Sequence, residues 1–495
     1  MSSWKADSPL TTCSWLSPLV RDRMHDDAGI AVSYAPSVRG PAWTSPWFEP
    51  WAAARQERCT SPSERRIIDQ KIAALADGAD VVMTGQQPGY LGGPLYTLLK
   101  AATCLRLADV RTAAGFPTVA LFWSGDDDDD LTEALDVKVW DVRRHVFLSA
   151  MNNPQWHGRR LGALPADAVG AAEYHWLVEQ SSQTPALKLT KLWQQAQDEQ
   201  WTWGALHARA LEVVFADQGL LTVSGDDSAL MSVADPIITR MTKLAPTLAK
   251  VAQASGAELS QQGYHAQISD RSLELPFHGV NGDRRLRFEH LSDVANTKAE
   301  DIRCGVLLRS PLQDWLFQPA AVVVGPGERS YLEQLRPVYD ELKIARSPLV
   351  PRLHLTFSSD SGHQPDSDNQ SEVISAADRV IETATDALFQ EMQKLDAAAL
   401  RNTADRTAAK WRGTVQRTLA ANAVKTQAQD KTSPWLTPPG GRPERVLPSY
   451  WAVALIHRFV DTILAMSGDH LKHWLNGNAK EFQWPLQNSD LEEQA

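Results

Sequence analysis

The chain has 495 residues, of which 43% are hydrophobic and 22% are charged, a composition typical of a globular protein with two or three domains. Its formal net charge is −11 and no basic stripe stands out, which argues against a nucleic-acid partner. No run approaches the roughly 18 apolar residues of a membrane helix, the first ten residues lack the apolar segment of a secretory signal, and the four cysteines have no CxxC spacing. The sequence therefore favours a cytoplasmic protein without a disulfide framework, a structural zinc site or a membrane span.

The first predicted unit is a strand at residues 81–83, a glycine-rich loop, a helix, and a second strand at residues 119–123. The loop carries Gly85, Gly89 and Gly93, which let a ligand approach the backbone, and the start of the helix offers free N–H groups to an anion. The loop matches neither GxxxxGK[ST] nor GxGxxG. The sequence thus excludes a P-loop and the usual dinucleotide fingerprint.

Two adjacent glutamines, Gln86 and Gln87, stand at the end of the first strand. Their amides can bind a carboxylate, an amine or a hydroxyl without carrying charge, and they can equally cap the turn or the helix. Elsewhere the sequence has no HxH, HExxH or GxSxG motif, which disfavours a histidine metal site and a serine hydrolase. The glutamines are therefore the first candidate ligand-binding side chains.

Five consecutive aspartates, residues 126–130, follow the second strand. Adjacent carboxylates repel one another, so the run predicts a solvated acidic loop unless it binds a cation. Two cations fit: Mg²⁺, which prefers oxygen ligands, or the ammonium group of an amino acid or amino sugar. Alternation along an extended segment places Asp126, Asp128 and Asp130 on one side, and we take Asp128 and Asp130 as the candidates.

Two further apolar segments, within residues 219–227 and 320–328, indicate strands that end in polar or glycine-rich turns. Strands that alternate with helical patterns predict an α/β fold with a mostly parallel sheet covered on both faces. In such sheets ligands bind beyond the carboxyl ends of the strands, which predicts one shared crevice. An arginine there could clamp a carboxylate or a phosphate. The candidates near the later strands are Arg309, Gln313, Gly325, Gly327 and Arg352.

Composition also divides the chain into parts. An Asn281-Gly282 turn between short strands predicts a hairpin, and a proline-free stretch with an alanine-rich apolar stripe predicts two antiparallel helices in a coiled-coil arm. Such a weak seam favours packing against a partner. The predicted parts are a core at residues 1–357 with an inserted subdomain at about 230–300, a linker at 358–371, the arm at 372–430, and a helical segment at 431–495 that returns to the core.

Several blocks of the sequence, taken together and in order, form a recognisable pattern. The first block is Thr84-Gly-Gln-Gln-Pro-Gly-Tyr-Leu-Gly-Gly-Pro-Leu-Tyr-Thr97 with Lys100 after it, and the second is Phe122-Trp123 before an acidic cluster. The later blocks are residues 307–314, 323–331, 351–352 and 442–447. In these blocks the chain resembles the cysteine-adding enzyme family of bacillithiol biosynthesis (BshC).

The resemblance implies a Rossmann-like core related to class I nucleotidyltransferases, with inserted connecting segments and a coiled-coil arm that forms a homodimer. It implies a ligase that adds cysteine to glucosaminyl-malate through an amide bond, the last step of bacillithiol biosynthesis, with ATP and Mg²⁺ serving to activate the cysteine carboxyl. Under this interpretation Gln86, Gln87, Asp128 and Asp130 act in catalysis, and no residue is a dedicated metal ligand. The residues expected to bind substrate or nucleotide are Gly85, Gly89, Gly93, Arg309, Gln313, Gly325, Gly327 and Arg352.

The chain departs from the family pattern at two places. Asp129 stands where the family has a histidine and Asp127 where it has a glutamate, while Pro88 and residues 90–92 replace a small residue and Leu-Phe-Thr. Two alternatives therefore stay open. One is a ligase or transferase of the same fold that acts on a different amine or amino acid, and the other is a non-catalytic scaffold or sensor that uses the arm.

Overall fold

The computed structural model describes residues 4–134, 138–141, 146–149, 156–168, 178, 184–268, 275–359, 452–453, 456 and 458–486. The predicted arm at residues 372–430 and nearly all of the predicted linker at 358–371 lie outside these residues. The proposed division into domains therefore stays a prediction.

A five-stranded parallel sheet forms the centre of the molecule, in the order β11-β10-β2-β3-β6. The four strands expected from apolar runs are all present, so the α/β fold with a parallel sheet is confirmed. The chain builds β2, β3 and β6 outward in one direction and then returns to add β10 and β11 on the other side of β2. The order thus reverses between β2 and β10, where a crevice opens in sheets of this type. The strands are β2 (Asp80–Gln86), β3 (Thr118–Ser124), β6 (Leu221–Ser224), β10 (Ala321–Val324) and β11 (Leu349–Pro351).

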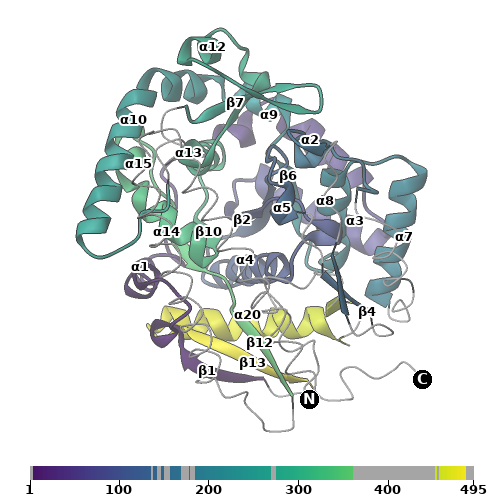
Figure 1. Ribbon diagram of the computed structural model, residues 1–495. Helices are drawn as coiled ribbons and strands as arrows, with labels where there is room; N and C mark the ends of the chain where they lie inside the picture. Colours follow the sequence, from purple (N-terminus) through teal and green to yellow (C-terminus); the bar gives the residue numbers. More distant parts are fainter. Residues whose placement is uncertain are drawn as a thin grey trace, which may run out of the picture.

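Helices cover both faces of this sheet, because successive side chains of a strand point to opposite faces. In β2, Val82 faces one core, whereas Val81 and Met83 face the other. The first core includes α4 (Leu95–Ala113), α8 (Trp203–Val214) and α20 (Phe459–Leu475), and the second includes α3 (Pro62–Ala76), α10 (Asp235–Gln261), α13 (Val306–Phe317) and α15 (Arg336–Leu342). In Figure 1, α4 lies between the sheet and α20.

A small antiparallel sheet, in the order β8-β7-β9, stands near the carboxyl ends of the central strands. It consists of β7 (Phe277–Asn281), β8 (Arg284–Arg287) and β9 (Ile302–Cys304), and α12 (Leu291–Ala295) lies beside it at the top of Figure 1. The hairpin expected at Asn281-Gly282 is confirmed, and its two loop residues are Gly282 and Asp283. Gly282 has a φ of 60°, which glycine adopts without steric cost.

A third sheet joins the two ends of the chain. Its order is β1 (Lys5–Pro9), β13 (Lys480–Leu486) and β12 (Leu355–Ser359), and none of these strands was predicted from the sequence. Within the predicted helical segment at 431–495, α20 spans Phe459–Leu475. It is followed by β13, so the C-terminal part is not helical throughout.

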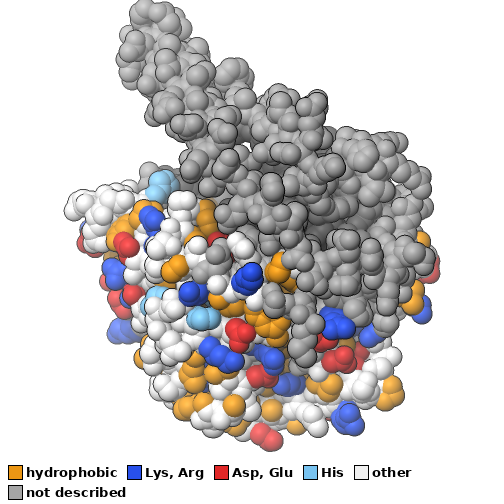
Figure 2. Space-filling model, turned by 90° about the horizontal axis from the view of Figure 1, so that it is seen from below, with side chains coloured by type: hydrophobic (Ala, Val, Ile, Leu, Met, Phe, Trp, Pro, Cys, Tyr) orange, Lys and Arg blue, Asp and Glu red, His pale blue; other side chains and the backbone are white. Residues whose placement is uncertain are grey.

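The remaining elements are shorter or lie at the periphery. They are α1 (Pro18–Asp22), α2 (Phe48–Glu57), α5 (Leu131–Ala134), α7 (Thr184–Asp198), α9 (Ser228–Val233), α14 (Pro326–Gln334), β4 (Lys138–Asp141) and β5 (Val146–Ser149). Among the residues that the structure describes, no helix combines the length and the apolar character needed to cross a bilayer. On the described part of the face seen in Figure 2, basic and acidic side chains are interspersed.

Candidate functional site

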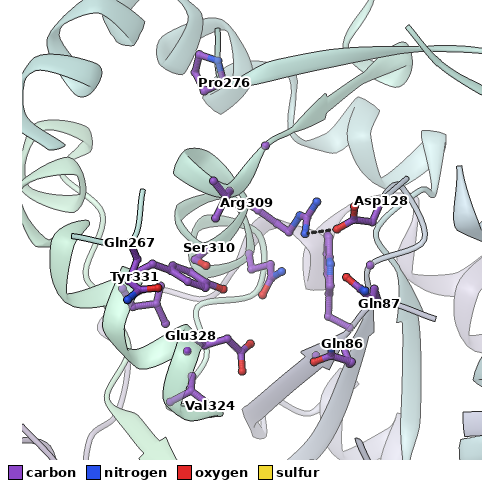
Figure 3. A pocket seen from close by; sticks show the side chains of 18 of the residues that line it. Gln86, Gln87, Asp128, Gln267, Pro276, Arg309, Ser310, Val324, Glu328 and Tyr331 are labelled. Atoms are coloured by element: carbon purple, nitrogen blue, oxygen red, sulfur yellow. Dashed lines mark hydrogen bonds and ion pairs between the residues drawn. The ribbon is translucent and has the colours of Figure 1, made fainter. Parts of the chain in front are cut away.

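A cavity of about 1280 Å³ opens at the carboxyl edge of the central sheet, where the strand order reverses. One wall is the end of β2 and the loop after β3, and a second is the start of α14 together with α13. The small sheet and α12 supply a further wall. Figure 3 shows Arg309 reaching across the cavity toward Asp128, with Gln86 and Gln87 below them.

The end of β2 is held by a buried lysine. Lys100, on α4, donates from Nζ to the Gly85 carbonyl at 2.8 Å and to Gln86 Oε1 at 3.0 Å, and it pairs with Glu328 Oε2 at 2.5 Å. Gln86 also donates to the Tyr96 hydroxyl at 3.1 Å. Lys100 therefore ties together both sides of the strand reversal, and it fixes Gln86 in the wall of the cavity.

Gly85 and Gln87 have different parts in this loop. A Cβ on Gly85 would lie 2.7 Å from the backbone oxygen of Trp123, so only glycine lets β2 and β3 approach this closely. Gln87 lines the cavity, and its buried Nε2 has no hydrogen-bond partner among the described residues. Buried polar groups are normally paired, so this amide is a donor available to a ligand.

Gly89 and Gly93, expected in the crevice, do not line the cavity. A Cβ on Gly89 would lie 2.5 Å from the Cα of Gly93, whose φ is 84°, so these glycines allow the tight turn that leads into α4. Gly89 donates its N–H to Nδ1 of the fully buried His207 at 3.2 Å. Both glycines therefore stabilise the conformation of the loop and do not contact the cavity.

The acidic run forms a turn, and the alternation expected for an extended segment is wrong. The Asp128 N–H donates to the Gly125 carbonyl at 3.1 Å, which bends the chain after β3. Asp126 points into the protein and accepts hydrogen bonds from the hydroxyls of Ser124 and Ser224. Burial raises the pKa of Asp126 to about 6. The first aspartate of the run therefore belongs to the core.

The middle aspartates are paired with arginines. Arg309 lies 3.2 Å from Asp127 Oδ2 and 3.4 Å from Asp128 Oδ2, and Arg285 lies 2.5 Å from Asp129 Oδ1. Burial opposes ionisation of Asp128, but the guanidinium groups of Arg309 and Arg285 hold its pKa below the usual range. Asp128 is thus an ionised carboxylate in the cavity wall.

Asp130 lies apart from this cluster. It is exposed and does not line the cavity, and its N–H points back to Asp128 Oδ1 at 3.3 Å. Its predicted catalytic role has no support from its position.

The arginines that pair with the acidic run also weaken the case for a Mg²⁺ site, because they already neutralise the carboxylates that would bind the ion. No group of three or more His, Cys, Asp or Glu side chains in the described ranges could hold a metal. The donor set therefore does not fit a metal site made by the protein alone.

The later candidates gather on the opposite wall. Gln313, Gly325, Gly327 and Arg352 all line the cavity. Gly325 precedes α14, and its N–H donates to Glu328 Oε2 at 2.7 Å. The buried Arg352 donates to the Leu353 carbonyl at 2.8 Å, and its guanidinium lies 5.6 Å from the centre of the Tyr96 ring.

Sequence reasoning missed two residues at the site, His278 and Arg285. Both come from the β7–β8 hairpin. The local sequence of the hairpin predicts a turn, but it does not predict which parts of the protein the hairpin packs against. The alternation of Arg285 and Arg287 along β8 was the available signal, since residues two apart share a face of a strand.

Comparison with known proteins agrees with this architecture. A family description, "Bacillithiol biosynthesis BshC, N-terminal Rossmann-like domain", matches residues 55–353. A protein of Koribacter versatilis named "Putative cysteine ligase BshC" is 29% identical over 318 residues, which cover 58% of this chain and 56% of the relative. Proteins of the same name from Bacillus cytotoxicus and Salinibacter ruber are 28% and 29% identical, over 58% and 60% of this chain and 57% and 58% of their own lengths.

The matches thus span a little over half the length of these curated relatives. The matched region contains all five strands of the central sheet and both sides of the cavity. The residues that match the Rossmann-like domain of the family make up more than half of this chain, and the chain therefore belongs to the BshC family of bacillithiol biosynthesis.

Proposed function

We propose that this protein is a cysteine ligase that joins the carboxyl of cysteine to the amine of glucosaminyl-malate, the last step of bacillithiol biosynthesis. The names of its relatives support the reaction class. The observation that carries the proposal is the cavity at the strand reversal, where a carboxylate, two arginines and an unpartnered amide line one space. Its volume of about 1280 Å³ exceeds the range of most small-molecule sites, about 300–1,000 Å³, and so suits more than one substrate.

The charged groups suit the substrates of such a reaction. Asp128 is ionised and can accept hydrogen bonds from a substrate ammonium group. The carboxylates of Asp127 and Asp128 fix the position of the Arg309 guanidinium, and its Nε, which has no partner among the described residues, is a donor for a carboxylate or a phosphate. Gln87 offers a neutral donor between them. Together they can orient an amino acid without binding it so tightly that the carboxyl is shielded.

The chemistry requires activation of the cysteine carboxyl. We propose ATP as the activating substrate: a carboxylate oxygen bonds to a phosphorus of ATP, and the remainder of the nucleotide, pyrophosphate for attack at the α-phosphorus or ADP for attack at the γ-phosphorus, departs with the electron pair of the broken P–O bond. The acceptor amine then forms the C–N bond, and the activated carboxyl loses its phosphate-bearing oxygen. The start of α14 from Gly327 onward forms the part of the cavity wall whose backbone N–H groups we propose to face phosphate, since the Gly325 N–H is already bonded to Glu328. Mg²⁺ would enter with the nucleotide, since the protein offers no preformed site for it in the described residues.

We also propose a cytoplasmic homodimer formed through residues 372–430. Light scattering of the purified protein, compared with a variant that lacks these residues, tests the dimer. A monomeric wild-type protein contradicts it.

Mass spectrometry tests the reaction directly. The protein is incubated with cysteine, ATP, Mg²⁺ and glucosaminyl-malate, and the expected product is heavier than the acceptor by one cysteinyl residue. Asp128→Asn should lower the rate by about 100-fold, the order of magnitude for loss of a well-placed charged contact. Asp69→Asn, which removes an exposed carboxylate paired with Arg65, is the matched control.

The acceptor is varied in the same experiment. Cysteinyl transfer to another amino sugar or amino acid, with none to glucosaminyl-malate, favours a ligase of different specificity. Absence of transfer to every amine overturns the proposal. In that case loss of the biological role on deletion of residues 372–430, with ligand binding retained, supports a scaffold.

A further inference from the structure

His278 is a buried histidine in the wall of the cavity, on β7 of the small sheet. Its exposed fraction is 3%. Neither Nδ1 nor Nε2 has a hydrogen-bond partner among the residues that the structure describes. Since buried imidazoles almost always make hydrogen bonds, an unpartnered ring beside a cavity points to a group that is completed by a ligand.

The neighbour of His278 on the central domain is Asp127. The distance from His278 Nε2 to Asp127 Oδ2 is 3.5 Å, and the side chain of Asp127 is 3% exposed. Asp127 Oδ1 is also buried without a partner. A carboxylate at this position favours the tautomer with a proton on Nε2, which leaves the lone pair on Nδ1. The pair therefore has the arrangement of an oriented base.

Charged groups surround the ring on several elements. Burial is the main cause that lowers the pKa of His278 well below its ordinary value, and the arginines act in the same direction, whereas the Asp127 backbone acts against them. The ring is therefore neutral at neutral pH and has a lone pair to offer. The charged groups that face it are Asp127 after β3, Arg285 and Arg287 on β8, Arg303 on β9 and Arg309 on α13.

Three carboxylates near the cavity are less suited to accept a proton. Asp126 is held by two serines inside the core, and Asp128 is stabilised in its ionised form by arginines. Glu328 is paired with Lys100 and with the Gly325 N–H. His278 differs from these carboxylates in being neutral, and its Nδ1 has no hydrogen-bond partner among the described residues.

We propose that His278 accepts the proton which the acceptor amine loses as the amide bond forms, with Asp127 as the positioning residue. This inference rests on the proposed function. The amine nitrogen bonds to the activated carbonyl carbon, the C–O bond to the phosphate-bearing oxygen breaks, and that oxygen leaves with the electron pair. The proton on the attacking nitrogen passes to Nδ1 of His278. The imidazolium that results is stabilised by the Asp127 carboxylate and then releases its proton to solvent.

The test separates proton transfer from the rest of the reaction. Hydroxylamine is largely unprotonated at neutral pH and a strong nucleophile, so it can capture activated cysteine as the hydroxamate without help from a base. His278→Gln should slow cysteinyl transfer to glucosaminyl-malate by about 100-fold or more, the usual range for general-base catalysis. The same variant should keep hydroxamate formation within about threefold of wild type, since activation does not use the base.

Two further measurements complete the test. In wild type, kcat/KM for glucosaminyl-malate should fall at acid pH through two ionisations, that of the acceptor amine and that of His278, and only the ionisation of the amine should remain in His278→Gln. His157→Gln, an exposed histidine outside the cavity, is the matched control and should leave both reactions unchanged. Asp127→Asn should show the same selective loss to a smaller extent.

The possible results are distinguishable. If His278→Gln forms the product at the wild-type rate, or loses both reactions equally while its unfolding curve is unchanged, the assignment of His278 is wrong. If the variant does not fold, a wild-type fall at acid pH that the ionisation of the acceptor amine accounts for completely overturns the assignment. If the wild-type protein makes neither product nor hydroxamate, the proposed function itself fails.

Discussion

Replacement of Arg309 by methionine tests how much its ion pairs with Asp127 and Asp128 stabilise the protein. The guanidinium lies 3.2 Å from Asp127 and 3.4 Å from Asp128, and the Asp127 side chain is only 3% exposed. Each contact has a Coulomb energy of about 5 kcal/mol at an effective dielectric constant of about 20. Most of this gain offsets the desolvation of the three groups, and removal of one partner from a buried pair typically costs about 3–5 kcal/mol. Arg285 still lies 3.9 Å from Asp128 in this variant. We therefore expect the free energy of unfolding to fall by an amount near the lower limit, about 3 kcal/mol.

The expected loss depends on pH in a defined direction. The pKa of Asp128 in the folded protein is held below its ordinary value, partly by Arg309, so the stability that this pair contributes is present above the ordinary aspartate pKa and is lost as pH falls through the lowered value. The difference between wild type and Arg309→Met should therefore be full at pH 7.5 and should shrink only as pH falls below the ordinary aspartate pKa of about 3.9, so the series is extended to about pH 3. Urea unfolding followed by tryptophan fluorescence measures it at each pH.

Two variants serve as controls for this measurement. Asp127→Asn added to Arg309→Met should recover more than half of the loss, because it removes the buried charge left without a partner. Arg65→Met breaks the exposed pair with Asp69 and should cost less than about 0.5 kcal/mol. A loss below about 1 kcal/mol for Arg309→Met, or one that does not change with pH, would refute the reasoning.

Three other changes have expected results. Gly85→Ala should destabilise the protein by about 1–3 kcal/mol and lower activity, because its Cβ would meet the Trp123 backbone oxygen at 2.7 Å. The control is Gly29→Ala, which should change neither, because no atom lies within 4 Å of the added Cβ. Thermal unfolding and the ligase assay compare the two variants. Lys100→Met should cost about 2–3 kcal/mol in urea unfolding, since it leaves the Gly85 carbonyl without its donor and Glu328 without its cation. Burial lowers the pKa of His207 to about 4, so the unfolded chain binds more protons below pH 6.5 and wild type should lose about 2 kcal/mol between pH 7 and pH 5 through this group. His207→Gln should flatten that slope, and an unchanged slope contradicts the assignment.

The central sheet could be predicted because its strands are buried on both faces. Residues 81–83, 119–123 and 322–324 are continuous apolar runs, and such runs are typical of parallel strands. In the third sheet, β1 (Lys5-Ala-Asp-Ser-Pro9) shows no alternation of polarity, whereas β13 has apolar residues at every second position from Phe482 to Leu486 and carried a strand pattern. Their pairing depends on partners hundreds of residues away, which local patterns do not report.

The candidate site was predictable to the extent that it depends on strand ends. Gln86, Gln87 and Gly325 meet because the carboxyl ends of parallel strands lie at one edge of a sheet. The position of His278 depends on how the hairpin packs over that edge, which is a tertiary property. The acidic run shows the same limit of local sequence patterns. Its carboxylates lie together in a turn because they pair with Arg285 and Arg309, which are about 160 and 180 residues further along the chain.

The order of the third sheet has a consequence for how the chain is made. Its middle strand, β13, leaves the ribosome after both of its neighbours, β1 and β12 (Figure 1). Until residues 480–486 emerge, β1 and β12 have no strand between them, and two unpaired edges invite contact with other nascent chains. A chain that stops before residue 480 would complete the central sheet yet leave this sheet open. Premature termination should therefore yield a protein with a formed cavity and a strong tendency to aggregate.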